Sequence, residues 1–186
     1  MPIDFFNAPC ARVDGNCKKE GVVCKKTTDA QRFGISDINS DKREPAFLDI
    51  EHEDSWDLAV TNTEMKSVTF KSIDFCVELF RPRIPGNPDK ELIKRCEGML
   101  YYENKLIFIE IKNRQTGRWL IDAREKFEET IQKFRECHPD SKLNLQKPII
   151  ANRLFRGTHQ NEMVQKRILK DSIGLDFILS TQITIE

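Results

Sequence analysis

The chain has 186 residues, of which 39% are hydrophobic and 32% are charged. This apolar content is enough to build a core, which excludes a wholly disordered chain, and the length fits a single domain. Thirty Lys and Arg residues balance thirty Asp and Glu residues, which excludes a protein that binds polyanions through bulk charge alone. Since no apolar run approaches the roughly 18 residues of a membrane span and no signal-peptide pattern is present, we expect a cytoplasmic protein without membrane contacts.

Residues 1–45 are predicted to form an irregular N-terminal arm, and residues 46–186 are predicted to form one α/β domain. In the arm, glycines interrupt polar runs and no helical or strand period persists. Cys10, Cys17 and Cys24 recur at seven-residue intervals, which allows either a metal site or scattered reduced thiols. Because CxxC pairs and a nearby histidine are both missing, the pattern favours the thiols.

The domain is predicted to begin with strands at 56–62 and 68–79, although part of the second segment also fits a helix. A loop rich in proline follows at 81–89. Two strand-like runs at 95–102 and 105–112 are then separated by only two residues. Such a short separation predicts a β-hairpin.

A helix is predicted at 118–137, where apolar residues recur at spacings of three and four and Pro139 ends the pattern. A short buried strand is predicted at 147–152. A second helix is predicted to begin at a Thr158 cap and to run to Ile173, with Gly174 at its end, and a last strand is predicted at 177–185. This order predicts an α/β fold in which a mixed central sheet contains the antiparallel hairpin and is flanked by helices.

One end of the predicted hairpin concentrates charge. If the turn is centred between residues 103 and 104, Glu97 lies opposite Glu110, and Lys112 shares their face, which is otherwise apolar. Opposed carboxylates on neighbouring strands repel each other, and a divalent cation such as Mg²⁺ or Mn²⁺ would offset both charges. The alternative is that this end protrudes into water, where Glu and Lys form an ordinary surface ladder.

These residues resemble a known family. Glu97 at the start of one strand and Glu110-Ile111-Lys112 at the end of the next are similar to the PD-(D/E)XK nuclease superfamily, which has the restriction-endonuclease-like fold. The resemblance covers roughly residues 60–155 and implies a core of a helix, three antiparallel strands, a helix and a strand, the first strand being at 75–79. The chain departs from the family pattern at Cys96, which replaces proline, and at Glu97, which replaces the usual aspartate.

The resemblance implies a metal-dependent phosphodiesterase that hydrolyses DNA or RNA, and it is compatible with a homodimer. Glu97, Glu110 and the main-chain carbonyl of Ile111 would bind Mg²⁺ or Mn²⁺. Lys112 would orient and activate the attacking water. Asp74, Glu64 and Glu78 are candidates for the further acid that the family often has, and Asp74 is preferred. The candidate phosphate contacts are nearby basic residues, namely Arg95, Arg114 and Arg118.

Two alternatives remain open at the level of the sequence. The first is a non-catalytic protein that keeps the nuclease-like fold and binds a protein or a nucleic acid. The replacement of aspartate by Glu97 and the zero net charge both favour it. The second is an interaction domain unrelated to nucleases, which a sheet order that separates the two acid-bearing strands would indicate.

Overall fold

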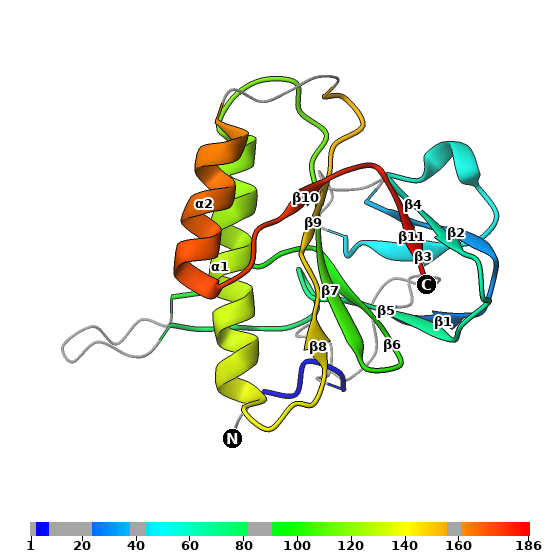
Figure 1. The fold of residues 1–186 in the computed structure, drawn as a ribbon, viewed down its shortest axis with the longest axis horizontal. Coiled ribbons are helices and arrows are strands. Elements are labelled where there is room, and N and C mark those ends of the chain that lie inside the picture. Colours follow the sequence, from blue (N-terminus) through cyan, green and yellow to red (C-terminus); the bar gives the residue numbers. More distant parts are fainter. Residues whose placement is uncertain (1–2, 8–23, 38–43, 82–90, 156–160) are drawn as a thin grey trace.

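A computed structural model describes residues 3–7, 24–37, 44–81, 91–155 and 161–186 of the chain. These residues form two mixed β-sheets and two α-helices, which confirms the predicted α/β fold with a mixed sheet. The elements pack in three layers, as Figure 1 shows. Both helices lie on one face of the larger sheet, and the smaller sheet covers its other face. The predicted flanking helices are therefore on one side only.

The larger sheet is built around the predicted hairpin. Its strand order is β1 (Lys25–Thr28), β5 (Val68–Ser72), β6 (Gly98–Tyr102), β7 (Lys105–Ile111), β9 (Ile149–Ala151) and β10 (Ile178–Leu179), and β8 (Asn144–Leu145) pairs with β7. Neighbours from β1 to β7 are antiparallel, whereas β9 is parallel to β7 and β10 is parallel to β9. The two acid-bearing strands are thus adjacent and are not separated in the sheet.

The first of the three predicted antiparallel core strands lies at a different place in the sequence from the predicted one. The segment 75–79 is not a strand, and β5 takes its place beside β6. The chain turns immediately after β5, at Asp74–Cys76, where Phe75 has a φ of 60° in the left-handed region. This turn ends the extended backbone that the β-branched and aromatic residues of 68–79 suggest.

The smaller sheet has the order β11 (Gln182–Ile185), β4 (Leu58–Asn62), β2 (Arg32–Ser36) and β3 (Phe47–Asp49), with a short 3₁₀ turn at Glu53–Ser55. The predicted absence of regular structure in residues 1–45 was therefore wrong for β1 and β2. β1 consists of four polar residues without an apolar period, and it is extended because it pairs with β5. In β2, Gly34 lies directly against the Trp56 ring, where a side chain would clash.

The cysteine prediction can be followed only in part, because Cys10 and Cys17 lie outside the described residues. Cys24 precedes β1, and its Sγ lies 2.9 Å from the Sγ of buried Cys76. Within the described part of the chain, no group of three or more His, Cys, Asp or Glu side chains has the arrangement of a metal site. The expectation of scattered thiols therefore stays a prediction for the N-terminal cysteines.

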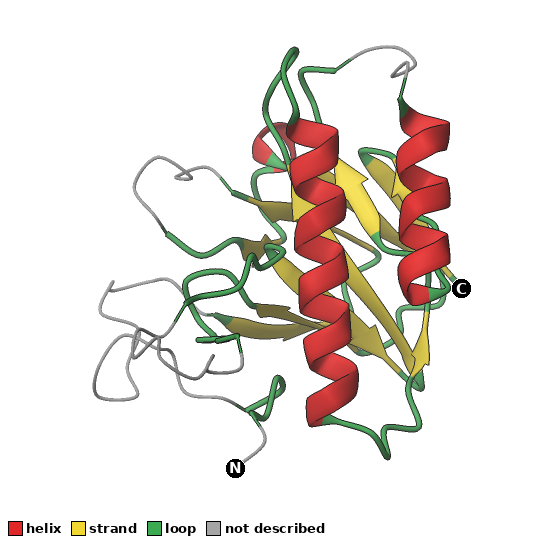
Figure 2. Cartoon of the chain, turned by 90° about the vertical axis from the view of Figure 1, so that its left-hand side faces the viewer, coloured by secondary structure: helices red, strands yellow, loops and turns green. Residues whose placement is uncertain are grey.

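The two helices, α1 (Trp119–Cys137) and α2 (Glu162–Ile173), lie side by side on the sheet, as Figure 2 shows. The predicted apolar stripe of α1 is buried, including Leu120, Ala123 and Phe127. α2 ends at Gly174 with a φ of 78°, as predicted, whereas its predicted Thr158 cap lies outside the described residues. Neither of these helices has both the length and the apolar character that crossing a bilayer requires.

The core has two parts, one on each face of the larger sheet. Met99 and Phe108 pack against the helices, whereas Leu100, Ile107 and Ile109 pack against the smaller sheet. This arrangement explains why the hairpin sequence is apolar on both faces. The two charged residues Glu97 and Glu110 share the helix-facing side of the sheet with Met99 and Phe108, and they therefore lie beneath α1.

Candidate active site

The hairpin brings the two predicted acids together. Gly98 pairs with Ile109 and Leu100 with Ile107, which is the register that the two-residue turn predicts. Glu97 precedes the paired stretch by one residue, and its main-chain N–H donates a 3.2 Å hydrogen bond to Glu110 Oε2. The acids are buried, Glu97 being 5% exposed and Glu110 0%, so the alternative of a surface ladder in water is wrong.

Three neighbouring segments fix the position of Glu97. Its main-chain carbonyl accepts hydrogen bonds from the N–H groups of Ile73, at 2.9 Å, and Asp74, at 3.3 Å, immediately after β5. The preceding N–H, of Cys96, donates a 3.0 Å hydrogen bond to Thr130 Oγ1 on α1. Since β5, β7 and α1 all hold this short stretch, the carboxylate of Glu97 projects from a rigid support.

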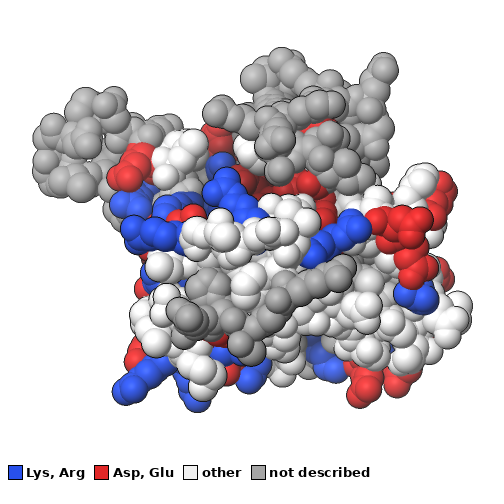
Figure 3. Space-filling model, turned by 90° about the horizontal axis from the view of Figure 1, so that it is seen from above, with Lys and Arg blue, Asp and Glu red and all other residues white. Residues whose placement is uncertain are grey.

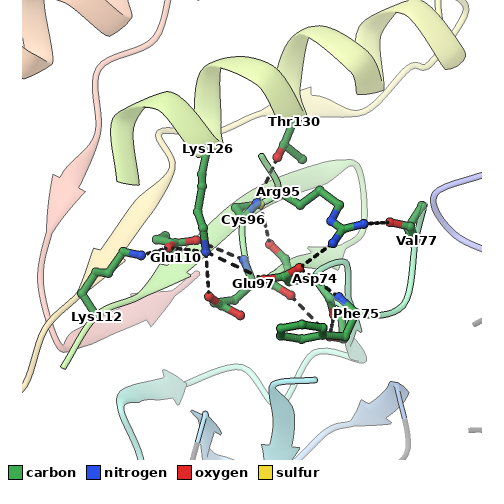
Figure 4. Close-up of polar contacts among 12 residues, drawn as sticks. Asp74, Phe75, Val77, Arg95, Cys96, Glu97, Glu110, Lys112, Lys126 and Thr130 are labelled. Carbon is green, nitrogen blue, oxygen red and sulfur yellow. Dashed lines mark hydrogen bonds and ion pairs between the residues drawn. The ribbon is translucent and has the colours of Figure 1, made fainter. Parts of the chain in front are cut away.

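Two lysines neutralise the acids, and only one of them was predicted. Lys112 Nζ lies 2.7 Å from Glu110 Oε1. The unpredicted Lys126 reaches down from α1, and its Nζ lies 2.9 Å from Glu110 Oε1, 3.1 Å from Glu97 Oε1 and 3.9 Å from Asp74 Oδ2 (Figure 4). A weak signal for Lys126 exists in the sequence, because it lies three residues after the buried Ala123 on the same helical face.

Burial governs the protonation of this cluster. Burial, and then the adjacent charge of Glu110, raises the pKa of Glu97 well above its usual range. Burial alone would lower the pKa of Lys126, but the nearby carboxylates of Glu110, Glu97 and Asp74 outweigh it and raise that pKa. Lys126 therefore remains charged, and Glu97 is an acid that takes up a proton readily.

Asp74, the predicted third acid, lies at the same site, but in the turn after β5 and not on a helix. Its Oδ1 accepts hydrogen bonds from the Phe75 N–H, at 3.0 Å, and from Arg95 Nη2, at 3.1 Å. Arg95 also donates a 3.1 Å hydrogen bond from Nη1 to the Val77 carbonyl. Arg95 was a candidate phosphate contact, and the structure instead engages its guanidinium with Asp74 and the turn.

A cavity of about 380 Å³ opens beside these groups. It is lined by residues of both charges, including Asp37, Asp74, Glu97, Lys112, Arg114 and Lys126. Figure 3 views the molecule from above and shows acidic side chains lying between basic ones on that face. Arg114 is exposed and forms no ion pair with any residue that the structure describes, so its guanidinium is available to an anion in the cavity. Ile111, whose carbonyl was a predicted ligand, also lines the cavity.

Asp37 is a further acid of this cavity that the sequence did not reveal, because it lies in the predicted irregular arm. It directly follows β2 and is 7% exposed. Its N–H donates a 2.7 Å hydrogen bond to Asp57 Oδ2, and Asn113, next to Lys112, donates a 3.2 Å hydrogen bond to Asp57 Oδ1. Asp57 thus joins the smaller sheet to the end of β7. Burial, followed by the charges of Asp57 and Glu110, raises the pKa of Asp37 to about 6.

The raised pKa of Asp37 predicts a pH-dependent effect of Asp37→Asn. Between pH 3.8 and about 6 the folded protein keeps a proton that the unfolded chain has lost, so this group destabilises the fold as the pH rises. The variant should raise the free energy of unfolding at pH 8 by up to about 3 kcal/mol, and should change it little near pH 4. Urea unfolding at both pH values measures this, with the exposed Asp54→Asn as the control. An equal effect at both pH values would contradict the assignment.

The two acids could contribute oxygen ligands to a hard divalent cation, although they do not belong to any described group of three or more side chains arranged as a metal site. Glu97 and Glu110 supply carboxylate oxygens, which are the ligands that Mg²⁺ and Mn²⁺ prefer. Glu110 Oε1 is fully buried and accepts no hydrogen bond of good geometry from the described residues, although two ammonium groups lie within 3 Å of it. This oxygen is thus paired with two cationic groups in the structure. In the structure, the ammonium of Lys126 lies between the two acids.

The site can therefore attract ions of both signs. Its acids can hold a cation, while Lys112 and Arg114 at the cavity can bind an anion such as a phosphate group. Comparisons of the chain with protein-family models, with curated proteins and with solved structures gave no match.

Proposed function

We propose that the protein is a metal-dependent phosphodiesterase of the PD-(D/E)XK type that hydrolyses DNA or RNA. The observation that carries the proposal is the meeting of Glu97, Glu110 and Lys112 at one buried end of an antiparallel hairpin, beside an open cavity. The element order supports it, because β5, β6 and β7 are followed by α1 and then by β9 parallel to β7. This order matches the core of the restriction-endonuclease-like fold from its three antiparallel strands onward, whereas the helix that opens that core has no counterpart among the described residues before β5.

In this proposal, the carboxylates of Glu97 and Glu110 and the main-chain carbonyl of Ile111 hold Mg²⁺ or Mn²⁺. When bound, such an ion supplies Lewis acidity that activates water and stabilises the negative charge that develops on the phosphate. The donor set supports this role, since both acids are buried and Glu110 Oε1 lacks a well-oriented hydrogen-bond donor among the described residues.

In this proposal, basic side chains of the protein contact the nucleic acid. Lys112 has a side chain that is 16% exposed and lines the cavity, so its Nζ can donate to a water molecule or to a phosphate oxygen there. Arg114 adds a guanidinium that can bind a phosphate in a bidentate way. These contacts supply affinity and position the backbone of the nucleic acid, but they do not select a sequence.

A cleavage assay tests the proposal. Single- and double-stranded DNA and RNA are incubated with the wild type and with Glu97→Gln, in Mn²⁺, in Mg²⁺ or in EDTA. We expect cleavage by the wild type in the presence of a divalent metal only, and a loss of roughly 100-fold or more in Glu97→Gln. Glu136→Gln, a substitution at an exposed position of α1, is the matched control and should cleave at the wild-type rate. Cleavage in EDTA, or no cleavage of any substrate, would overturn the proposal.

A second candidate function is a non-catalytic protein of the same fold that binds a protein or a nucleic acid. One observation favours it: Lys126 pairs with both acids and Lys112 pairs with Glu110, so two ammonium groups balance the two carboxylates without a metal. Such a protein would bind its partner without cleaving nucleic acid, and millimolar Mn²⁺ would leave its melting temperature unchanged.

A further inference from the structure

Lys126 occupies the place that a cation would take between the two acids. Its Nζ lies 2.9 Å from Glu110 and 3.1 Å from Glu97, and Figure 4 shows it pointing from α1 into the acidic cluster. Lys112 differs from it, because among the described acids it forms an ion pair with Glu110 alone, at 2.7 Å. Lys126 is therefore the residue whose ammonium contacts the two acids simultaneously.

The position of Lys126 is built into the fold. The Lys126 side chain is 19% exposed, and α1 is anchored next to it by the hydrogen bond between Thr130 and the Cys96 N–H. Ala123 and Thr130, three residues before and four residues after Lys126, are both fully buried against the sheet. An exposed ion pair on a helix lacks this support and contributes little. The contact of Lys126 is instead a buried one, in which the charge of each partner depends on the other.

We propose that Lys126 is an internal competitor of the divalent cation: its ammonium and the ion exclude each other between Glu97 and Glu110. This inference rests on the proposed function, since it assumes that the two acids bind a metal. A protonated ammonium has no lone pair and cannot be a ligand, and two cations at one pair of carboxylates repel each other strongly in a buried site.

Metal binding must therefore move the ammonium of Lys126 away from the acids. Asp74 Oδ2, at 3.9 Å, offers the displaced ammonium another carboxylate within the same cavity. Two consequences follow. The metal-free protein keeps a neutralised, stable site, and the metal affinity of the wild type is lower than that of the same acids without the lysine.

Calorimetric titration with Mn²⁺ tests this competition in the full-length protein. We expect Lys126→Met to lower the Kd for Mn²⁺ by roughly 10- to 100-fold, because the ion no longer displaces a charge. Lys126→Arg keeps the charge and should bind Mn²⁺ no more tightly than the wild type. The matched control is Lys133→Met, the same substitution on the same helix at a residue that pairs with Glu136. It should leave the Kd unchanged.

A second readout is the melting temperature without metal. It should fall in Lys126→Met, because two buried acids lose their shared cation, and Mn²⁺ should then raise it by more than it does in the wild type. If Lys126→Met does not fold without metal, recovery of its folded circular dichroism spectrum on adding Mn²⁺ supports the competition. Failure of that variant to fold at any Mn²⁺ concentration, together with an unchanged Kd in Lys126→Gln, overturns it.

The remaining outcomes separate this inference from the proposed function. If Lys126→Met and the wild type bind Mn²⁺ with the same Kd, the competition is overturned, whereas the metal-dependent function stands. If neither protein binds Mn²⁺ at millimolar concentration, both are overturned. Binding by Lys126→Met but not by the wild type supports the competition in its strongest form. Tighter Mn²⁺ binding by Lys126→Arg than by the wild type would show that the shape of the side chain, and not its charge, limits metal binding. That result would overturn the inference.

Discussion

Lys112→Ala is expected to lower the rate of metal-dependent cleavage by about two to four orders of magnitude, the range typical of a positioned proton-transfer group. The same variant should keep the rise in melting temperature that Mn²⁺ causes. Lys112 contacts Glu110 but supplies no ligand atom to the ion, and Glu110 retains Lys126 as a partner in the variant. Cleavage rates and thermal unfolding with and without Mn²⁺ measure the two effects on the same sample.

The control for this variant is Lys147→Ala, which removes an exposed lysine that pairs with Asp176. It should change neither the rate nor the metal-dependent shift. A Lys112→Ala protein that cleaves at the wild-type rate would remove Lys112 from the chemistry. A variant that loses the Mn²⁺ effect together with the cleavage would instead indicate that Lys112 acts by supporting the metal site.

Glu110→Gln is expected to abolish the stabilising effect of Mn²⁺ and to lower the free energy of unfolding of the metal-free protein by about 3–5 kcal/mol. Glu110 is fully buried, and both Lys112 and Lys126 lie within 3 Å of its Oε1. Removing its charge leaves the partly buried Lys112 without its ion-pair partner, and leaves Lys126 with Glu97 and the more distant Asp74. Urea unfolding of the wild type and the variant in EDTA measures the loss.

Because of Lys126, the expected change in the free energy of unfolding on Glu110→Gln has the opposite sign to the one that the sequence alone suggests. From the sequence, only Lys112 lies beside the two acids, so removing one of two like charges would leave the metal-free fold unchanged or slightly more stable. Glu97→Gln is the matched comparison: burial and the charge of Glu110 raise the pKa of Glu97, so removing the charge of Glu97 costs less and the loss of stability should be smaller. A Glu110→Gln protein as stable as the wild type would contradict the charge balance between the two lysines and the two acids.

The parts of the fold that were predicted correctly are those that local sequence determines. The short separation of two apolar runs set the hairpin register from Gly98 to Ile109, and the spacing of apolar residues located α1 within one residue at its start. The smaller sheet could not be found in this way. It joins β11 at the end of the chain to β4 and β2, and the polar strand β1 is regular because of a partner strand 40 or more residues away.

In the candidate site, too, the residues that local sequence positions could be predicted, and the residues that tertiary packing positions could not. Glu97, Glu110 and Lys112 could be grouped from the sequence because a tight turn and side-chain alternation fix their relative positions. Lys126 and Asp37 could not be placed at the site from the sequence. The position of Lys126 depends on how α1 packs across the sheet, and that of Asp37 depends on how the smaller sheet covers the end of β7. Asp74 was chosen from the sequence on weaker grounds, and the structure brings it to within 3.9 Å of Lys126.

The most direct test of a metal site at these acids is an anomalous difference map from crystals soaked in Mn²⁺. We expect a manganese peak in contact with carboxylate oxygens of both Glu97 and Glu110, with Lys126 Nζ moved away from them. A map without a peak at millimolar Mn²⁺, in which Lys126 still lies between the two acids as in Figure 4, would contradict the account.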